Sequence, residues 1–309
     1  MPIAGPPIAG PGGPTPPEPE ERIAVTWTAP DGTVWPLTVP RGDVRAQATD
    51  ALGAAVPVEV TTDPNPRGGA TVRHVQPIER YLILPILVRG RTHQEFVERW
   101  RAVGRAFTQT KWRGPGVLRV QRPDGSAREI SAQYVSGWAG RPEHGWTWDV
   151  ADALTLLAPD PYWLSTEEVE ITRQFQATGL DFYDEFMTIV SSAVLGESTV
   201  VNQGDAIAWP VWTVTGPLDQ LTATNHTTGQ TFVLDPDWDG GGSLGPGETV
   251  TIQTDPVRVR GPNGEIWTGA ITGPLWGLDP GESEVEFTAS GADEGTSVVL
   301  RFRLRYETA

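Results

Sequence analysis

The sequence predicts a mainly β protein of about two domains with one amphipathic helix, and three observations support this fold class. The chain has 309 residues, enough for about two domains with a core in each. Its 35 glycines and 29 prolines are typical of a protein with many turns. Its 13 tryptophans indicate strands rich in aromatic residues.

The first segment, residues 1–21, is rich in proline and glycine and then acidic, with almost nothing to bury. This composition predicts a flexible, partly polyproline tail. The alternative is an arm that becomes ordered on a neighbouring subunit. The predicted N-terminal β domain, residues 22–164, begins with a hairpin in which residues 23–27 and 34–39 flank the Asp31-Gly32 turn.

An exposed loop is predicted within this domain at residues 63–69, which contain two prolines and two glycines. Residues 56–60 before the loop and residues 70–76 after it alternate like strands. A loop of this length suits contact with a partner.

The core of the N-terminal domain is predicted between Glu79 and Trp163. Residues 81–88 form an apolar run that is too short to span a membrane and predicts a strand buried on both faces. A helix is predicted over residues 92–110, because Thr92 and Glu95 have the spacing of a capping box. Its apolar stripe has the spacing of one helix face and consists of Phe96, Trp100, Val103 and Phe107.

Strands are predicted after Pro115 ends the helix, at residues 117–120 and around 146–148. Residues 165–199 are predicted to be a strand followed by a connector. The C-terminal domain, residues 200–309, is all strand and turn, which predicts an antiparallel β-sandwich. Its predicted strands are residues 209–214, 221–224, 231–234, 249–254, 257–259, 266–271, 284–289 and 297–306.

Composition excludes several classes of function. The chain has no cysteine, so it has neither disulfides nor thiolate metal sites. A net charge of -16 argues against electrostatic binding of nucleic acid. No apolar run approaches the roughly 20 residues of a spanning helix, and no signal-peptide pattern is present. We therefore expect synthesis in the cytosol and no membrane association.

Motifs for catalysis, cofactors and metals are weak. The four histidines lack metal-ligand spacing, and no G-x-S-x-G motif occurs. Residues 240–245 satisfy G-x-G-x-x-G, but Pro246 and a strand follow where a dinucleotide site needs a helix, so a hairpin loop is predicted. Asp235, Asp237 and Asp239 resemble half of a calcium loop without its terminal glutamate, which leaves an acidic hairpin or a weak Ca²⁺ site. We expect no catalytic residue, cofactor or metal.

Four tryptophans have two interpretations. Trp138, Trp146, Trp148 and Trp163 could be sugar-binding platforms, because aromatic faces with polar edges suit such sites. Packing in the core or at an interface is the favoured prediction, because strands this rich in tryptophan must bury most of that surface.

The order of motifs resembles the distal tail (Dit) protein family of siphoviruses, the phages with long non-contractile tails. The resemblance covers residues 22–309 and depends on the sequence of motifs, since no single one is diagnostic. In the N-terminal half they are residues 80–90, the helix, residues 114–125 and residues 158–163; in the C-terminal half they are residues 209–217, 252–256 and 299–306.

The resemblance implies a virion structural protein at the tail tip, made in the host cytoplasm. The N-terminal domain of such proteins forms a hexameric ring, and a galectin-like sandwich projects from it. The implied partners are further copies of the chain, the tail tube protein, the tape measure protein, the tail-associated hub protein and, in some phages, receptor-binding proteins. DNA passes through the ring without being read.

We expect no enzyme activity and predict contacts at two surfaces. One is the loop of residues 63–69, and the other is the basic face of the last strand. A carbohydrate-binding virion module that recognises a host cell-wall glycan is the first alternative function. A tail-bound hydrolase is the second, and it would need two carboxylates about 5–9 Å apart. The candidate interface residues are Asp63, Pro64, Asn65, Pro66, Arg67, Arg301, Arg303 and Arg305.

Overall fold

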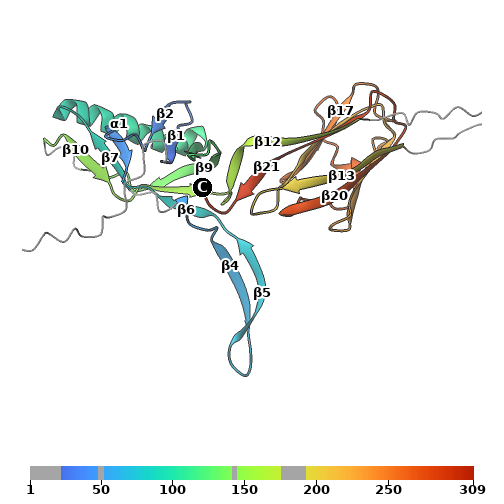
Figure 1. Cartoon of the computed structure of the whole chain (residues 1–309), viewed down its shortest axis with the longest axis horizontal. Helices are drawn as coiled ribbons and strands as arrows, with labels where there is room; N and C mark the ends of the chain where they lie inside the picture. The colour runs from blue at the N-terminus through green and yellow to red at the C-terminus, as the bar shows by residue number, and fades with distance from the viewer. Residues whose placement is uncertain (1–21, 48–51, 141–144, 175–192) are drawn as a thin grey trace, which may run out of the picture. The chain divides into compact units, whose positions relative to one another are not determined.

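The structure is a computed structural model that describes residues 22–47, 52–140, 145–174 and 193–309. These residues belong to two units, which meet in the chain between Pro161 and Tyr162. Both units consist mainly of antiparallel strands (Figure 1). The predicted tail, residues 1–21, and residues 175–192 of the predicted connector lie outside the described residues.

The main sheet of the first unit grows from the predicted N-terminal hairpin. Gly32 has φ +83°, which the Asp-Gly turn requires, and Trp27 lies opposite Trp35 in the ladder. Every pairing in this sheet is antiparallel. Its strands in order are β2 (Val34–Pro36), β1 (Ala24–Thr28), β8 (Gly116–Gln121), β9 (Ala127–Ser136), β11 (Thr155–Ala158) and β6 (Arg80–Ile83).

The predicted helix is confirmed as α1 (His93–Thr108), followed by the short α2 (Thr110–Arg113). Thr92 caps α1, since its side chain accepts a hydrogen bond from the backbone N–H of Glu95. The predicted apolar stripe is buried in the core of the unit. Position 104 of the helix requires glycine, because a Cβ there would come within 2.4 Å of the Trp138 ring.

The prediction of one strand over residues 81–88, buried on both faces, is wrong. The run forms β6 and the separate strand β7 (Ile86–Arg89), which pairs with β3 (Val44–Ala46) and β10 (Trp148–Ala151) in a second sheet. Pro85 lies at the break, and proline has no N–H for a ladder hydrogen bond. In β6 the burial alternates, so Tyr81 and Ile83 are exposed.

The second unit is a sandwich of two antiparallel sheets around one core. Trp212 from one sheet meets the ring of Phe232 from the other with centroids 5.3 Å apart and that of Phe287 at 5.6 Å. One sheet has the order β18 (Val257–Arg260), β17 (Thr249–Thr254), β14 (Val211–Thr215), β21 (Ser297–Tyr306), β12 (Trp163–Gln174); the other has β13 (Ala193–Asn202), β20 (Gly281–Ser290), β15 (Gln220–Asn225), β16 (Gln230–Leu234), β19 (Ile271–Thr272).

Two segments of the second unit differ from the prediction. The expected strand over residues 266–271 is a 3-10 turn, Thr268–Ala270, followed by the two-residue β19. Its backbone passes close to Trp238, because a Cβ on Gly269 would lie 2.4 Å from that ring. Residues 163–174, which the prediction divides between the N-terminal domain and the connector, form β12 and pair with β21. No helix among the described residues is long and apolar enough to cross a membrane.

Candidate functional site

A hairpin of exposed strands is the first candidate contact surface. The strands β4 (Val58–Pro64) and β5 (Ala70–Pro77) pair with each other and with no other strand of the described chain (Figure 1). Side chains on both faces of this hairpin are exposed. An isolated two-stranded hairpin is marginally stable in water, so a partner surface is expected to support it.

The exposed side chains of this hairpin include a set of valines. Val58, Val60, Val72 and Val75 have between 48% and 57% of their surface exposed. Four exposed β-branched apolar residues on one ribbon favour burial against another molecule. The alternation of residues 56–60 and 70–76 indicated the strands but not this exposure, because a half-buried strand has the same pattern.

The predicted interface residues 63–67 lie at the tip of the hairpin. Asp63 and Pro64 belong to β4, and the turn begins at Asn65, whose carbonyl accepts a hydrogen bond from Gly68 at 3.0 Å. Arg73 of β5 makes a bidentate pair with Asp63, with N–O distances of 2.7 and 2.9 Å. The bidentate pair holds the two strands in register near the tip. Pro64, Asn65, Pro66 and Arg67 are exposed.

The predicted basic face of the last strand is engaged within its own unit. Arg301 pairs with Glu170 of β12 at 2.8 Å. The Arg303 guanidinium donates to the carbonyl of Ser165. The Arg305 guanidinium lies 4.3 Å from the ring centroid of Tyr162. These contacts stabilise the pairing of β12 with β21, and an additional role at an interface stays a prediction.

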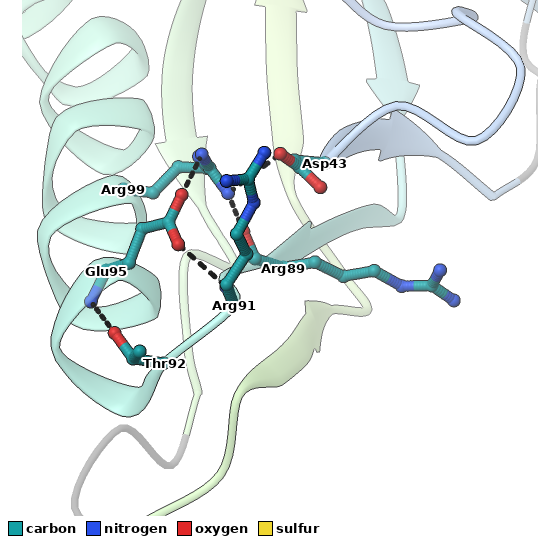
Figure 2. Close-up of polar contacts among 6 residues, drawn as sticks. All are labelled: Asp43, Arg89, Arg91, Thr92, Glu95 and Arg99. Carbon is teal, nitrogen blue, oxygen red and sulfur yellow. Dashed lines mark hydrogen bonds and ion pairs between the residues drawn. The ribbon is translucent and has the colours of Figure 1, made fainter.

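A polar cluster fixes the start of α1 against the second sheet of the first unit (Figure 2). The Glu95 carboxylate accepts from the Arg91 backbone N–H at 2.8 Å and from Arg99 at 2.8 Å. Arg99 also pairs with Asp43 at 3.1 Å and donates to the Arg89 carbonyl. The Arg91 N–H, followed by the Arg99 charge, lowers the pKa of Glu95. The Thr92 half of the predicted capping box is confirmed, but the Glu95 carboxylate accepts from Arg91, the residue before the N-cap, instead of from the Thr92 N–H. Arg99 links this cluster to β7 through the Arg89 carbonyl.

The four tryptophans of the sequence prediction fall into two groups. Trp163 is buried, and Trp138 is half-buried with its ring 4.6 Å from that of Trp100, so core packing is confirmed for these two. Trp146 and Trp148 are exposed, with centroids 6.5 Å apart. Trp148 lies on β10, an edge strand of the three-stranded sheet. For Trp146 and Trp148, interface packing stays the prediction.

The acidic loop of the second unit lies between β16 and β17. One carboxylate oxygen of each aspartate accepts a hydrogen bond from a loop N–H: Asp235 from Asp237, Asp237 from Gly242, and Asp239 from Gly241. Among the described residues, no group of three or more histidine or acidic side chains is arranged to hold a metal ion. The glycine-rich residues 240–245 belong to the same loop and lead into β17, not into a helix.

Comparison with known proteins identifies the fold. The described residues form two β-rich units, and the first of them carries one long helical segment. The crystal structure of the Dit protein of phage SPP1 matches with a TM-score of 0.58 and 13% identity, covering 92% of this chain and 99% of that one. The protein therefore has the Dit fold, and the resemblance inferred from its motifs is confirmed at this level.

Baseplate structures of phage P2 also match, over 93% of this chain and all of theirs. The activated baseplate with Ca has a TM-score of 0.46 and 9% identity, and the one with Sr has 0.48 and 10%. No protein-family model and no curated protein sequence matches the chain.

Proposed function

We propose that the protein is the distal tail component of a long non-contractile phage tail and is a structural protein, not an enzyme. The match to SPP1 Dit over nearly the full length of both chains carries this proposal. SPP1 Dit is described as a paradigm of the hub of the adsorption apparatus in phages that infect Gram-positive bacteria. By the same role, this chain would join the tail tube to the tip and receptor-binding proteins in the virion.

The proposed assembly is a ring, with six copies as the expected number. The exposed hairpin β4–β5 supports it, because its outer edges pair with no other strand of the described residues and its valines are exposed, so the ribbon suits a neighbouring copy. Identical copies that close around an axis satisfy such edges without leaving a free one. The tail tube, tape measure and tail-associated hub proteins would contact the ring, and DNA would pass through its lumen. The second unit would project as a galectin-like sandwich.

The first test of this proposal is the mass of the purified full chain in solution. Light scattering at several protein concentrations and salt concentrations should give a hexamer or an equilibrium between monomer and hexamer. Electron microscopy of the same sample should show closed rings. A strict monomer at every concentration, together with absence of the protein from tail tips labelled by a specific antibody, would overturn the proposal.

A second candidate function is the recognition of a cell-wall glycan, and one observation favours it. Trp238 of the second unit is 43% exposed, although its ring packs on the backbone at Gly269. The exposed carboxylates of Asp237 and Asp239 lie on the same loop. An exposed indole beside polar groups is suited to stack on a sugar ring. Binding on a glycan array that Trp238→Ala abolishes would support this function, and no binding by the wild-type chain would remove it.

A further inference from the structure

A pocket of about 430 Å³ opens in the first unit between the helical segment and the β1–β2 hairpin. Neither the hairpin β4–β5 nor the polar cluster of Figure 2 contributes to it. The helical segment supplies Arg105, Gln109, Trp112 and Arg113, and the β1–β2 hairpin supplies Asp31 and Trp35.

The charge of this pocket is opposite to that of the chain. The helical segment, residues 93–113, has five basic and two acidic side chains, whereas the whole chain has a net charge of -16. Within the described chain, the guanidinium groups of Arg105 and Arg113 have no hydrogen bond or ion pair. Asp31 is the acidic group of the lining, and hydrogen bonds from Thr33, followed by Gln109 and the charge of Arg113, lower its pKa. Two arginines against one carboxylate leave the pocket positive, so it suits an acidic ligand.

The walls of the pocket are aromatic. Trp112 is 70% exposed, so its ring is accessible to a ligand. Trp35 is half-buried, and its indole N–H is buried without an acceptor in the described structure. A buried donor without an acceptor costs about 1–3 kcal/mol. A ligand with apolar rings and free carbonyl groups would therefore suit this wall.

The chain itself contains a segment with this chemistry. Residues 14–21 consist of four prolines, one threonine and three glutamates, in the order Pro-Thr-Pro-Pro-Glu-Pro-Glu-Glu. Proline-rich segments adopt the polyproline II helix and bind grooves lined by aromatic side chains. Each proline offers a carbonyl without a competing N–H, and the glutamates can pair with arginines.

We propose that residues 14–21 bind in the pocket between α1, α2 and the β1–β2 hairpin. The prolines pack on Trp112 and Trp35, and the glutamates pair with Arg105 and Arg113. The segment is long enough to do so, because eight residues of polyproline II span about 25 Å. Trp35 pairs with Trp27, and Trp27 lies about 10 Å along β1 from Ala24, where this strand begins. This distance is shorter than the span of the segment.

The test uses the full chain with one nitroxide label. The chain has no cysteine, so Gly13→Cys places a single label directly before the proposed segment. Electron paramagnetic resonance should show a slow-tumbling component in the labelled protein at low salt. The double substitution Arg105→Glu with Arg113→Glu should reduce that component at least five-fold, as should Trp112→Ala. Raising the salt concentration from 50 to 500 mM should weaken it as well, because both charged partners are near the surface.

A matched control has the same change in net charge elsewhere. Arg119→Glu with Arg258→Glu replaces two exposed arginines outside the pocket and should leave the slow component unchanged. Adding Glu18→Arg and Glu20→Arg to the Arg105→Glu, Arg113→Glu protein should restore it. Circular dichroism checks that each variant is folded. Dilution with unlabelled protein separates binding to the same chain, which is independent of concentration, from binding to a neighbour.

Two results would overturn the proposal. In the first, the label tumbles freely in the wild-type background at every salt concentration. In the second, the label is immobilised, but the pocket variants and the control variant affect it equally, which would mean that the segment binds elsewhere.

Discussion

The indole of Trp27 stacks on the ring of Phe107, with ring centroids 4.8 Å apart. Its N–H donates a hydrogen bond to the carbonyl of Ala106 at 3.0 Å. Trp27 lies on β1 and Phe107 in the last turns of α1, so this one side chain fastens the helical segment to the main sheet of the first unit. Both rings are fully buried. The pocket at Arg105 and Trp112 depends on this contact, because it positions the same helical turns.

Removing the ring of Phe107 should therefore destabilise the first unit strongly. Phe107→Ala is expected to lower the free energy of unfolding by about 3–5 kcal/mol, because it leaves a cavity under Trp27. Trp112→Ala removes a larger side chain of the same segment that is 70% exposed, and its effect should be much smaller than that of Phe107→Ala. Urea denaturation followed by circular dichroism measures both. Equal effects of the two substitutions would contradict the packing described for Phe107.

The Glu95 carboxylate should contribute a pH-dependent part of the stability. The Arg91 N–H and the Arg99 charge lower its pKa below the ordinary value of 4.5. A carboxylate with a lowered pKa in the folded state stabilises the fold fully above its unfolded pKa and loses this effect as the pH falls through the folded pKa. Denaturation midpoints measured between pH 7 and pH 3 should thus fall less for Glu95→Gln than for the wild type. Parallel curves for the two proteins would show that the cluster does not stabilise the fold.

Gly137 should tolerate no side chain. Its φ is +89°, and a Cβ would lie 1.6 Å from the Ala153 carbonyl oxygen. Gly137→Ala is therefore expected to cost more than about 4 kcal/mol, through the backbone conformation and the clash together. Gly125 has φ +86° with nothing near its Cβ position, so Gly125→Ala should cost only about 1–2 kcal/mol. The two variants differ in the clash alone, and their unfolding free energies test it.

The elements that the sequence predicted are those whose cause is local. The helix followed from Thr92, Glu95 and the spacing of its apolar stripe, all of which operate within a few turns. The first hairpin followed from Asp31-Gly32, because the turn needs a positive φ. The strand β12 was assigned to two domains, because its pairing with β21 joins residues more than 120 positions apart. The residues around Trp163 contain no local pattern that predicts this pairing.

The candidate surfaces were harder to predict than the elements. The prolines and glycines indicate the loop near Asp63, but the exposure of Val58 and Val72 depends on which elements of the described residues pack against the hairpin. Trp35 and Trp112 line the same pocket, and they belong to segments that only the fold of the first unit places together. Conversely, Arg301 and Arg303 alternate along a strand as an exposed basic face would, yet β12 supplies their partners.

The hairpin β4–β5 should be necessary for assembly but not for folding of the monomer. Replacing Val58, Val60, Val72 and Val75 together by threonine keeps their shape and strand preference while removing apolar surface. Since these side chains are already exposed, the unfolding free energy of each unit should change by less than about 0.5 kcal/mol per substitution. Light scattering should give the mass of a monomer at concentrations where the wild type is a ring.

The control is Val257→Thr with Val34→Thr, two exposed valines outside the hairpin, which should leave the ring intact. If the hairpin variant still forms rings at the wild-type concentration, the hairpin is not the contact that closes them, and the exposed edge strand β10 with Trp148 becomes the surface to alter next.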